Sequence, residues 1–302
     1  MTSDLFIAGC GYVGAAVARL ALERGVRVSA LTRNPVRAAA LRELGVKVVV
    51  ADLASDAWHR EVPAAPRWVV NCVSSSGGGV DGYRKSYVEG TTSLVRWVEN
   101  AGGTDALLYT GSTSVYPQGA GERVDETSPV GAADERGALL LEAERLVQEA
   151  ARAARRRFVL RLAGIYGPSR HHWLEQVRTG EVSGGGAHRL NLIHRDDAAA
   201  AILACLGSEL GPGAHVFNVA DDAPTPKAEV AAWLAQRMGL PPPRFTGLAH
   251  PARRAVVPDR VIVNAALRRE TGWRPSFPTF REGYESILSR GTDAAQSGAA
   301  IT

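Results

Sequence analysis

Cysteine and lysine are both scarce in this sequence. Only three cysteines, Cys10, Cys72 and Cys205, occur among 302 residues, far apart and in apolar surroundings. An odd count at these spacings argues against a disulfide framework and a metal site, so we expect no metal and a reduced, cytoplasmic compartment. Lysine occurs three times, and arginine therefore supplies 32 of the 35 basic residues.

The sequence also lacks long apolar runs and clustered charge. No apolar stretch approaches the roughly 20 residues that a membrane span needs, and we expect no signal peptide. The net charge is only +4, and the one dense basic run is Arg155, Arg156 and Arg157. We expect this run at the end of a helix, where it would interact with the helix dipole. The expected partner is a small-molecule substrate, with neither nucleic acid nor a membrane, and a homodimer stays open.

Short apolar segments alternate with helical patterns through the first half of the chain. Continuous apolar runs are typical of strands that are buried on both faces of a sheet. The expected strands span residues 5–8, 26–31, 46–50, 68–73, 106–109 and 158–162, and the expected helices span 13–24, 35–44, 83–101 and 134–154. Repeated strand–helix–strand order predicts an α/β fold with a doubly wound parallel sheet of the Rossmann kind.

The second half of the chain is less regular, with glycine and proline clusters between short elements. We expect a Rossmann core over residues 1–166 and a small C-terminal substrate lobe over most of residues 167–302. A helix at 195–206 and a strand at 216–219 would return to the main sheet. Residues from about 191 to 220 would then belong to the core.

A glycine-rich motif joins the first expected strand to the first expected helix. It reads Gly9-Cys10-Gly11-Tyr12-Val13-Gly14. In this context Gly9 permits a tight turn, Gly11 lets the backbone approach a pyrophosphate, and Gly14 lets helix and strand pack closely. The helix N-terminus would present free N–H groups to the phosphates. These six residues therefore predict a dinucleotide site, the alternative being a glycine-rich turn without a ligand.

The residues after the second and third strands indicate which dinucleotide binds. The second strand ends in Thr32 and Arg33, without the acid that would hold the ribose hydroxyls of NAD. Arg33 could pair with a 2′-phosphate, which favours NADP, with NAD as the second choice and a solvated loop arginine as the alternative. Asp52 and Leu53 after the third strand suit the adenine edge, although Asp52 could equally cap a following helix.

A loop of short side chains follows the fourth strand. Val73 ends that strand, and the loop runs as Ser-Ser-Ser-Gly-Gly-Gly over residues 74–79, so Val73 and Ser74 are the expected cofactor contacts. Such a loop at the carboxyl end of a strand would pass beside the cofactor and contact a ribose or a phosphate. The alternative is a loop that needs glycine only for its turns.

Several further motifs, in order along nearly the whole chain, resemble one protein family. They include Thr-Gly-Ser-Thr-Ser-Val-Tyr at 110–116, Val-Asp-Glu-Thr-Ser-Pro at 124–129, Arg-Leu-Ala-Gly-Ile-Tyr-Gly-Pro at 161–168, Asn-Leu-Ile-His-Arg-Asp-Asp at 191–197 and Phe-Asn-Val-Ala-Asp at 217–221. With the glycine motif, they are similar to the extended short-chain dehydrogenase/reductases, the NAD-dependent epimerase/dehydratase group. The resemblance implies a nucleotide-binding core, a C-terminal substrate lobe and a nicotinamide cofactor.

The resemblance also implies a catalytic serine or threonine followed by a Tyr-x-x-x-Lys pair on the next helix. Ser112 matches the serine. Arg136 stands where the tyrosine should be and Leu140 where the lysine should be, and none of the seven tyrosines is followed four residues later by lysine. A tyrosine near its ordinary pKa is a poor base at neutral pH unless a cation is close. The usual proton relay is therefore missing.

Two residues are candidates to replace that relay. Tyr116 lies near the end of the fifth strand, although in the family a tyrosine here usually has a structural or substrate-contact role. His171 lies where the chain should enter the substrate lobe, and imidazole exchanges protons near neutral pH, although a loop histidine can simply face solvent. The sequence therefore predicts an NAD(P)-dependent epimerase/dehydratase-like oxidoreductase for a small polar or nucleotide-sugar-like substrate. The alternative is a non-catalytic NAD(P)-binding protein that senses redox state.

Overall fold

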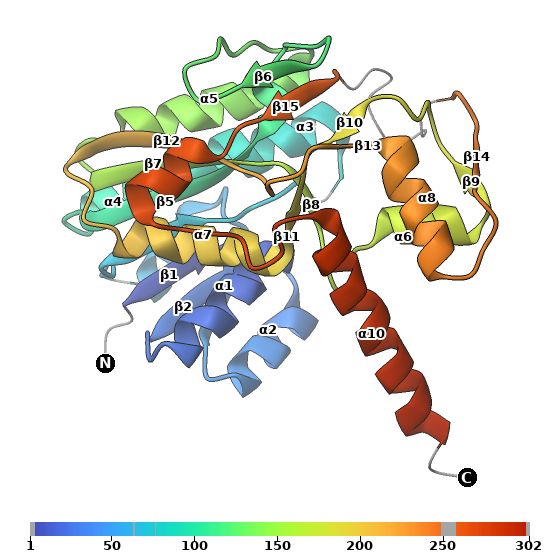
Figure 1. Cartoon of the computed structure of the whole chain (residues 1–302). Coiled ribbons are helices and arrows are strands. Elements are labelled where there is room, and N and C mark those ends of the chain that lie inside the picture. Colours follow the sequence, from blue (N-terminus) through green and yellow to red (C-terminus); the bar gives the residue numbers. More distant parts are fainter. Residues whose placement is uncertain (1–3, 63, 76, 249–257, 300–302) are drawn as a thin grey trace.

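The computed structural model describes residues 4–62, 64–75, 77–248 and 258–299 and centres on one parallel sheet (Figure 1). The sheet has seven strands in the order β12-β7-β5-β4-β1-β2-β3, and every neighbouring pair is parallel. Its strands are β1 (Leu5–Ala8), β2 (Val28–Thr32), β3 (Lys47–Val50), β4 (Trp68–Asn71), β5 (Thr104–Ser112), β7 (Ala154–Leu162) and β12 (Gly213–Val219). The main helices around it are α1 (Tyr12–Glu23), α2 (Pro35–Glu43), α4 (Gly90–Asn100), α5 (Glu135–Glu149) and α7 (Arg195–Gly207). This is the predicted doubly wound Rossmann architecture.

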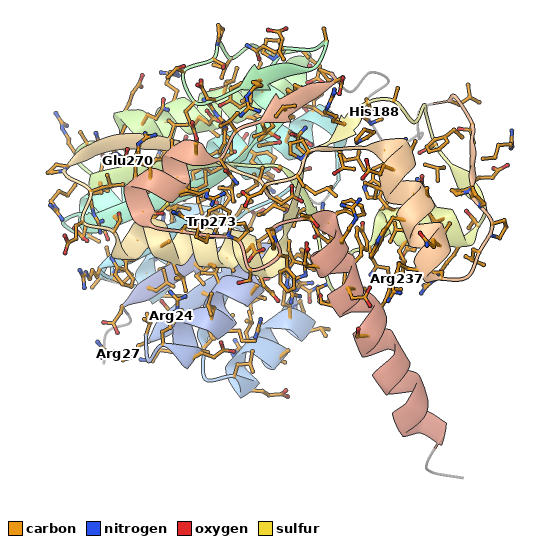
Figure 2. All side chains as sticks on the ribbon, viewed as in Figure 1. Arg24, Arg27, His188, Arg237, Glu270 and Trp273 are labelled. Carbon is orange, nitrogen blue, oxygen red and sulfur yellow. The ribbon has the colours of Figure 1, made fainter. Side chains whose placement is uncertain are left out.

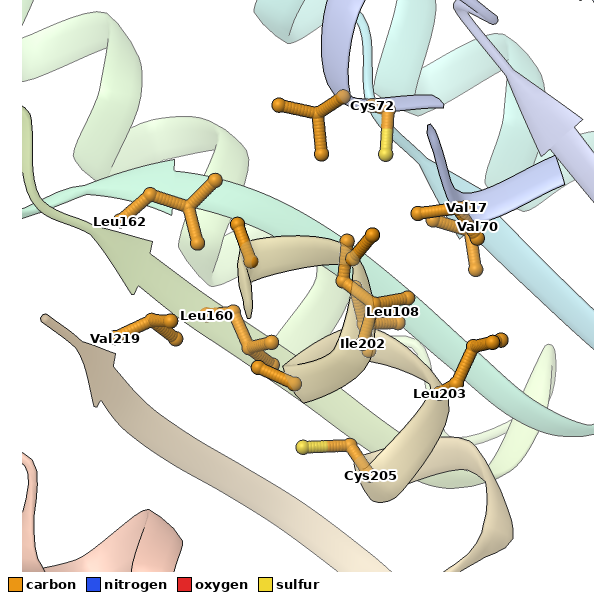
Figure 3. Packing of buried hydrophobic residues seen from close by; sticks show 14 of the residues in the cluster. Val17, Val70, Cys72, Leu108, Leu160, Leu162, Ile202, Leu203, Cys205 and Val219 are labelled. Carbon is orange, nitrogen blue, oxygen red and sulfur yellow. The ribbon is translucent and has the colours of Figure 1, made fainter. Parts of the chain in front are cut away.

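The central strands are buried on both faces, because successive side chains point to opposite sides and helices cover each side, whereas the edge strand β3 is partly exposed. In β1, Leu5 and Ile7 join one hydrophobic cluster, and Phe6 and Ala8 join another. The first cluster includes side chains of α1 and α7, and the second includes side chains of α4 and α5. Figure 3 shows Ile202 of α7 packed near Leu108 and Leu160 of the strands. All these strand residues are apolar, which is why their sequence shows continuous rather than alternating hydrophobicity.

The chain changes direction in the sheet at β1. From β1 it runs outward through β2 and β3, and it then returns to the other side of β1 to build β4, β5, β7 and β12. Ligands of open parallel sheets bind at such a reversal point, beyond the carboxyl ends of the strands. The fold therefore places the candidate site beyond the ends of β1 and β4.

Smaller elements surround this sheet. They are η1 (Asp56–Glu61), α3 (Gly79–Tyr83), η2 (Arg84–Glu89), η3 (Thr113–Val115), β6 (Glu122–Val124), β8 (Gly164–Tyr166), α6 (His172–Arg178), β9 (Glu181–Val182), β10 (Arg189–Leu190), β11 (Leu192–His194), β13 (Thr225–Pro226), α8 (Lys227–Arg237), β14 (Arg244–Phe245), β15 (Arg260–Ile262), α9 (Ala265–Thr271) and α10 (Phe280–Ala299). Figure 1 shows α6, α8, β9 and β14 gathered beside the sheet, with α10 extending away from the body. Leu174, Val177, Val230 and Leu234 share a separate hydrophobic cluster there.

The arginine run lies in a strand, and the expectation of a helix end was wrong. Helix α5 ends at Glu149, and β7 already begins at Ala154. Arg156 is 2% exposed and donates to the Asp105 carboxylate at 2.7 Å and to the Leu206 carbonyl at 2.9 Å. Arg155 binds the same carboxylate at 2.8 Å. The Asp105 and Leu206 oxygens bind one terminal nitrogen, Nη2, of a guanidinium that is buried within the sheet layer, and a local sequence pattern does not reveal such distant partners.

The expected helix at 83–101 is a continuous helical segment that changes its winding. It begins as α3, continues through the π-helical turns of η2, and ends as α4. A π-helical turn re-aims the side chains around it and is frequent at functional sites. Within the described ranges, none of the helices is both long and apolar enough for a membrane span. The three cysteines are free thiols in the core.

The buried Asp221, just after β12, should make stability depend on pH. Burial raises the pKa of Asp221 well above its usual 3.8. The native state then holds a proton that the unfolded chain has lost, so stability declines as pH rises from about 3.8 through the raised pKa. Asp221→Asn is expected to flatten this decline in urea unfolding measured at several pH values. Glu149→Gln, which removes an exposed ion pair with Arg145 far from Asp221 in the sequence, is the control and should keep the decline. An unchanged slope in Asp221→Asn would contradict the assignment.

Candidate functional site

The glycine motif forms a tight loop between β1 and α1. Gly9 has φ +75°, and a Cβ there would lie only 2.5 Å from Cγ2 of Val73. The Gly9 and Cys10 amides both donate to the Leu31 carbonyl, at 3.0 and 3.1 Å. Burial raises the pKa of the Cys10 thiol to about 12, so this cysteine is a packing residue and not a nucleophile. A left-handed, crowded turn of this kind requires glycine at position 9.

The start of α1 is open to an anion. Among the described side chains none caps this helix, and its first turn contains no acidic residue. A Cβ on Gly11 would meet nothing nearer than 3.8 Å, whereas a Cβ on Gly14 would lie 2.9 Å from the Gly9 carbonyl oxygen. Gly11 therefore leaves free space above the helix end, and Gly14 allows close helix–strand packing. The uncapped N–H groups and the positive end of the helix dipole suit a pyrophosphate.

Two exposed arginines lie beyond the end of β2. Thr32 ends the strand, and Arg33 follows it on the surface. Asn34 caps α2 by accepting a hydrogen bond from the Arg37 amide at 3.0 Å. The Arg37 guanidinium reaches back towards Gly11, and its Nη1 would lie 3.8 Å from a Cβ placed on that glycine. The sequence interpretation had singled out Arg33 and missed Arg37, which lies one helical turn further on.

Asp52 and Leu53 occupy the loop after β3. The Asp52 carboxylate binds the Lys85 ammonium at 2.8 Å and accepts from the Ala54 amide at 3.2 Å. Burial alone would raise the pKa of Asp52, but Lys85 and this amide hold it below its usual value. Ser55, not Asp52, caps the next helical turn, so the capping alternative was wrong. Leu53 is 4% exposed and packs in the core between the sheet and α4.

The loop after β4 passes beside the glycine motif. Val73 packs directly against Gly9, since a Cβ placed on that glycine would lie only 2.5 Å from Cγ2 of Val73. Ser74 follows Val73, and Ser76 lies outside the described residues. The Ser75 amide donates to the hydroxyl of Tyr87 at 3.4 Å. Burial raises the pKa of Tyr87, with a smaller opposing effect from the Arg170 guanidinium. Tyr87 therefore contacts this loop, and Arg170 lies close to Tyr87. The sequence offers no functional reason to select either residue, because both contacts join distant segments.

Ser112 and Tyr116 flank the short helical turn η3 at the carboxyl end of β5. Ser112 is partly exposed, and its Oγ accepts from the Ser114 amide at 3.1 Å. Tyr116 is 1% exposed, and its hydroxyl accepts from Arg161 at 2.8 Å and donates to Asn218 at 2.9 Å. Arg161 also binds the buried Glu144 carboxylate at 2.7 Å. The Tyr116 hydroxyl thus has both its roles filled within a buried network.

His171 lies at the start of α6, on the turn that follows β8. Its side chain is 22% exposed, and Nε2 lies 3.8 Å from a Glu175 carboxylate oxygen. Its Nδ1 is buried without a hydrogen-bond partner among the described residues. The same turn contacts the glycine motif, because the Tyr12 hydroxyl donates to the Pro168 carbonyl at 2.9 Å. The structure therefore brings the His171 turn to the glycine loop.

The helix that would hold the usual proton relay has a different surface here. Leu140 is 5% exposed and packs in the core. Arg136 is exposed, and its guanidinium lies 5.2 Å from the ring centre of Tyr83. Tyr83 in turn contacts Tyr87, with ring centres 5.1 Å apart. Arg136 of α5, Tyr83 and Tyr87 thus form one chain of contacts.

The family model of the NAD-dependent epimerase/dehydratase family matches residues 5–220. A conserved protein of unknown function from Silicibacter pomeroyi is 25% identical, with a TM-score of 0.77, 96% of this chain and 99% of that chain covered. A protein from Methylobacillus flagellatus, provisionally named an NAD-dependent epimerase/dehydratase, is 28% identical, with a TM-score of 0.71. The match covers 97% of this chain and 100% of that protein. MoeE5, solved with UDP-glucuronic acid and NAD, shares the fold at 21% identity, with a TM-score of 0.82 and coverage of 96% and 99%. No protein of curated function shows significant similarity to this chain.

Proposed function

The chain belongs to the NAD-dependent epimerase/dehydratase family, and from that premise we propose that it is an NADP-dependent oxidoreductase or epimerase with a non-standard proton relay. Its substrate would be a small polar molecule of the nucleotide-sugar kind. MoeE5, which shares the fold, was solved with UDP-glucuronic acid and NAD and also with UDP-glucose and NAD. The proposal rests mainly on the start of α1, which has no side-chain cap and has free space above Gly11. The exposed Arg37 lies beside this space, and Arg33 lies one helical turn before it.

The residues for holding the cofactor are grouped by the part of the dinucleotide they would contact. The amides at the start of α1 would bind the pyrophosphate, and Arg33 and Arg37 would pair with the 2′-phosphate. Asp52, with Leu53 behind it, would contact the adenine edge, and Val73 and Ser74 would pass beside the ribose. When bound, the nicotinamide supplies hydride transfer to or from a substrate carbon.

The protein must then polarise the substrate oxygen and move one proton. Ser112 is partly exposed at the end of β5, and its hydroxyl can donate a hydrogen bond to that oxygen. His171, whose side chain is 22% exposed at the start of α6, is our candidate for moving the proton. Tyr116, the other candidate, is better suited to bracing Arg161 and Asn218, because its hydroxyl is bonded on both sides.

A non-catalytic, dinucleotide-sensing role is the second candidate function. It is favoured by one observation, the burial of Leu140 at the position where the family lysine would stand. Arg136 cannot replace the tyrosine as a base, because a guanidinium stays protonated in proteins. Turnover of any substrate with bound cofactor would exclude this second role.

Arg33→Ala is expected to weaken NADPH binding by about 10- to 100-fold, the effect of losing one charge-assisted contact to phosphate. NADH binding should change little, since NADH lacks the 2′-phosphate. Calorimetric titration of both cofactors measures the difference. Arg24→Ala, at the far end of α1 and labelled in Figure 2, is the matched exposed-arginine control. Equal losses for NADPH and NADH would rule out the assigned role of Arg33.

UDP-glucose is expected not to be turned over, even with cofactor bound, because neither Leu140 nor Arg136 can serve the usual relay. A panel of hydride-transfer and epimerisation assays tests this expectation. For any substrate that does react, His171→Gln should lower kcat by about 100-fold, the usual contribution of a general acid or base. Strong epimerisation of UDP-glucose that disappears only on replacing Arg136 would contradict the proposed site.

A further inference from the structure

Tyr12 connects two parts of the chain that are far apart in sequence. It is the first residue of α1, and its hydroxyl donates to the carbonyl of Pro168, 156 residues away, at 2.9 Å. The guanidinium carbons of Arg170 and Arg195 lie 5.6 and 5.2 Å from the centre of its ring. Tyr12 thus joins the glycine loop to the turn after β8 by one hydrogen bond and two cation–π contacts.

That turn, residues 167–170, has an unusual backbone. The Gly167 amide donates to the Arg170 carbonyl at 3.1 Å, and the Arg170 amide donates to the Gly167 carbonyl at 3.0 Å. Ser169, the residue after Pro168, has φ +62°, a value that this turn position normally reserves for glycine. A non-glycine residue persists in this region only when its surroundings hold it there. The surroundings of this turn include the Tyr12 hydroxyl.

The contact between Tyr12 and Pro168 depends on the absence of a side chain at Gly167. Its φ is +149°, and a Cβ on it would lie 2.8 Å from the Tyr12 hydroxyl oxygen and 3.3 Å from Nε2 of His194. A side chain at this position would push the hydroxyl away from Pro168. The glycine and the tyrosine therefore form a matched pair across the contact.

We propose that Tyr12 is a positioning residue through which the bound dinucleotide sets the place of the 167–171 turn, and with it Arg170 and His171. The proposal rests on the proposed function, in that the dinucleotide binds at the start of α1. Phosphates bound there would fix the first turn of α1, including the backbone of Tyr12. The ring and hydroxyl then transmit this constraint to Pro168, two residues before Arg170 and three before His171.

The coupling must act in both directions. If dinucleotide binding orders the turn through Tyr12, an ordered turn must strengthen dinucleotide binding by the same factor. Loss of the hydroxyl should therefore weaken binding modestly, by about 3- to 10-fold for one neutral hydrogen bond. Without the hydroxyl, the dinucleotide should still bind but should no longer order the 167–171 turn. A tyrosine with a merely structural role would not produce this separation.

The experiment is amide hydrogen exchange of the full chain with and without NADPH, read in peptides that cover residues 164–174. In the wild type, NADPH should slow exchange in these peptides. In Tyr12→Phe, NADPH should still bind within about 10-fold of wild-type affinity, but the peptides should no longer be protected. Tyr109→Phe, which removes a buried hydroxyl without a partner among the described residues, is the matched control and should behave as wild type.

The possible outcomes separate the two claims. Protection of 164–174 that persists in Tyr12→Phe would overturn the proposal while leaving dinucleotide binding intact. Complete loss of NADPH binding in Tyr12→Phe would also overturn it, because the residue would then be a direct ligand. Failure of the wild type to bind NADPH or NADH would overturn the proposed function itself, and the positioning role with it.

Discussion

Replacing Gly11 by valine is expected to abolish binding of NADPH and NADH, while the thermal midpoint of the apo chain stays within about 3 °C of wild type. The folded chain has room for the substitution, since a Cβ on Gly11 would come no closer than 3.8 Å to the Arg37 guanidinium and the Gly9 carbonyl oxygen. The same space lies above the start of α1, where a pyrophosphate must approach the backbone. A branched side chain would fill it.

Calorimetric titration and thermal unfolding of the same samples measure the two effects. Gly211→Val is the matched control, because a Cβ there meets nothing within 4 Å and the residue lies in the loop before β12. This control should bind like wild type. Gly14→Val should lose stability as well as binding, since its Cβ would lie 2.9 Å from the Gly9 carbonyl oxygen. Binding of Gly11→Val within tenfold of wild type would reduce the motif to a turn.

Glu144→Ala is expected to destabilise the fold by about 3–5 kcal/mol, the cost of leaving a buried charge without its partner. Arg161 and Glu144 have side chains only 6% and 3% exposed, and they are 2.7 Å apart. Burial raises the pKa of Glu144, and the hydrogen bonds and charge of Arg161 oppose that rise. Arg161 also donates to Tyr116, so the loss should extend to the network that joins β5, β7 and β12.

Urea unfolding measures this loss against a control in the same helix. Glu149→Ala removes the exposed pair with Arg145, whose partners are 60% and 62% exposed, and should cost only about 0.5 kcal/mol or less. A loss below about 1 kcal/mol for Glu144→Ala would mean that Arg161 finds other partners or water. The network would then contribute little to the end of β5.

The local parts of the site could be predicted from the sequence, because they depend on neighbouring residues. The spacing of Gly9, Gly11 and Gly14 between an apolar run and a helical pattern predicted the loop and the helix that the structure contains. The order of strands and helices likewise predicted the parallel sheet. In both cases the signal lies within short segments read one at a time, since backbone geometry and hydrophobic periodicity are local.

The remaining features depend on contacts between distant segments. The bond from Tyr12 to Pro168 spans 156 residues, and the glycine motif alone gives no sign of it. The Arg155, Arg156 and Arg157 run resembled a helix end, yet Arg156 is buried against the Asp105 carboxylate and the Leu206 carbonyl in the last turn of α7. Whether such residues are buried, and which residues they contact, depends on packing between distant segments, and the local pattern of residue types carries no information about it.

The most direct test of the central claim, an NADP site that works without the usual Tyr-x-x-x-Lys pair, is a crystal structure of this chain with NADPH. We expect the pyrophosphate at the start of α1 and the 2′-phosphate in contact with Arg33. We also expect Ser112 and His171 within about 4 Å of the face of the nicotinamide ring at C4, the range of direct proton and hydrogen-bond contacts. A 2′-phosphate away from Arg33, or a nicotinamide approached by neither Ser112 nor His171, would contradict the proposed site.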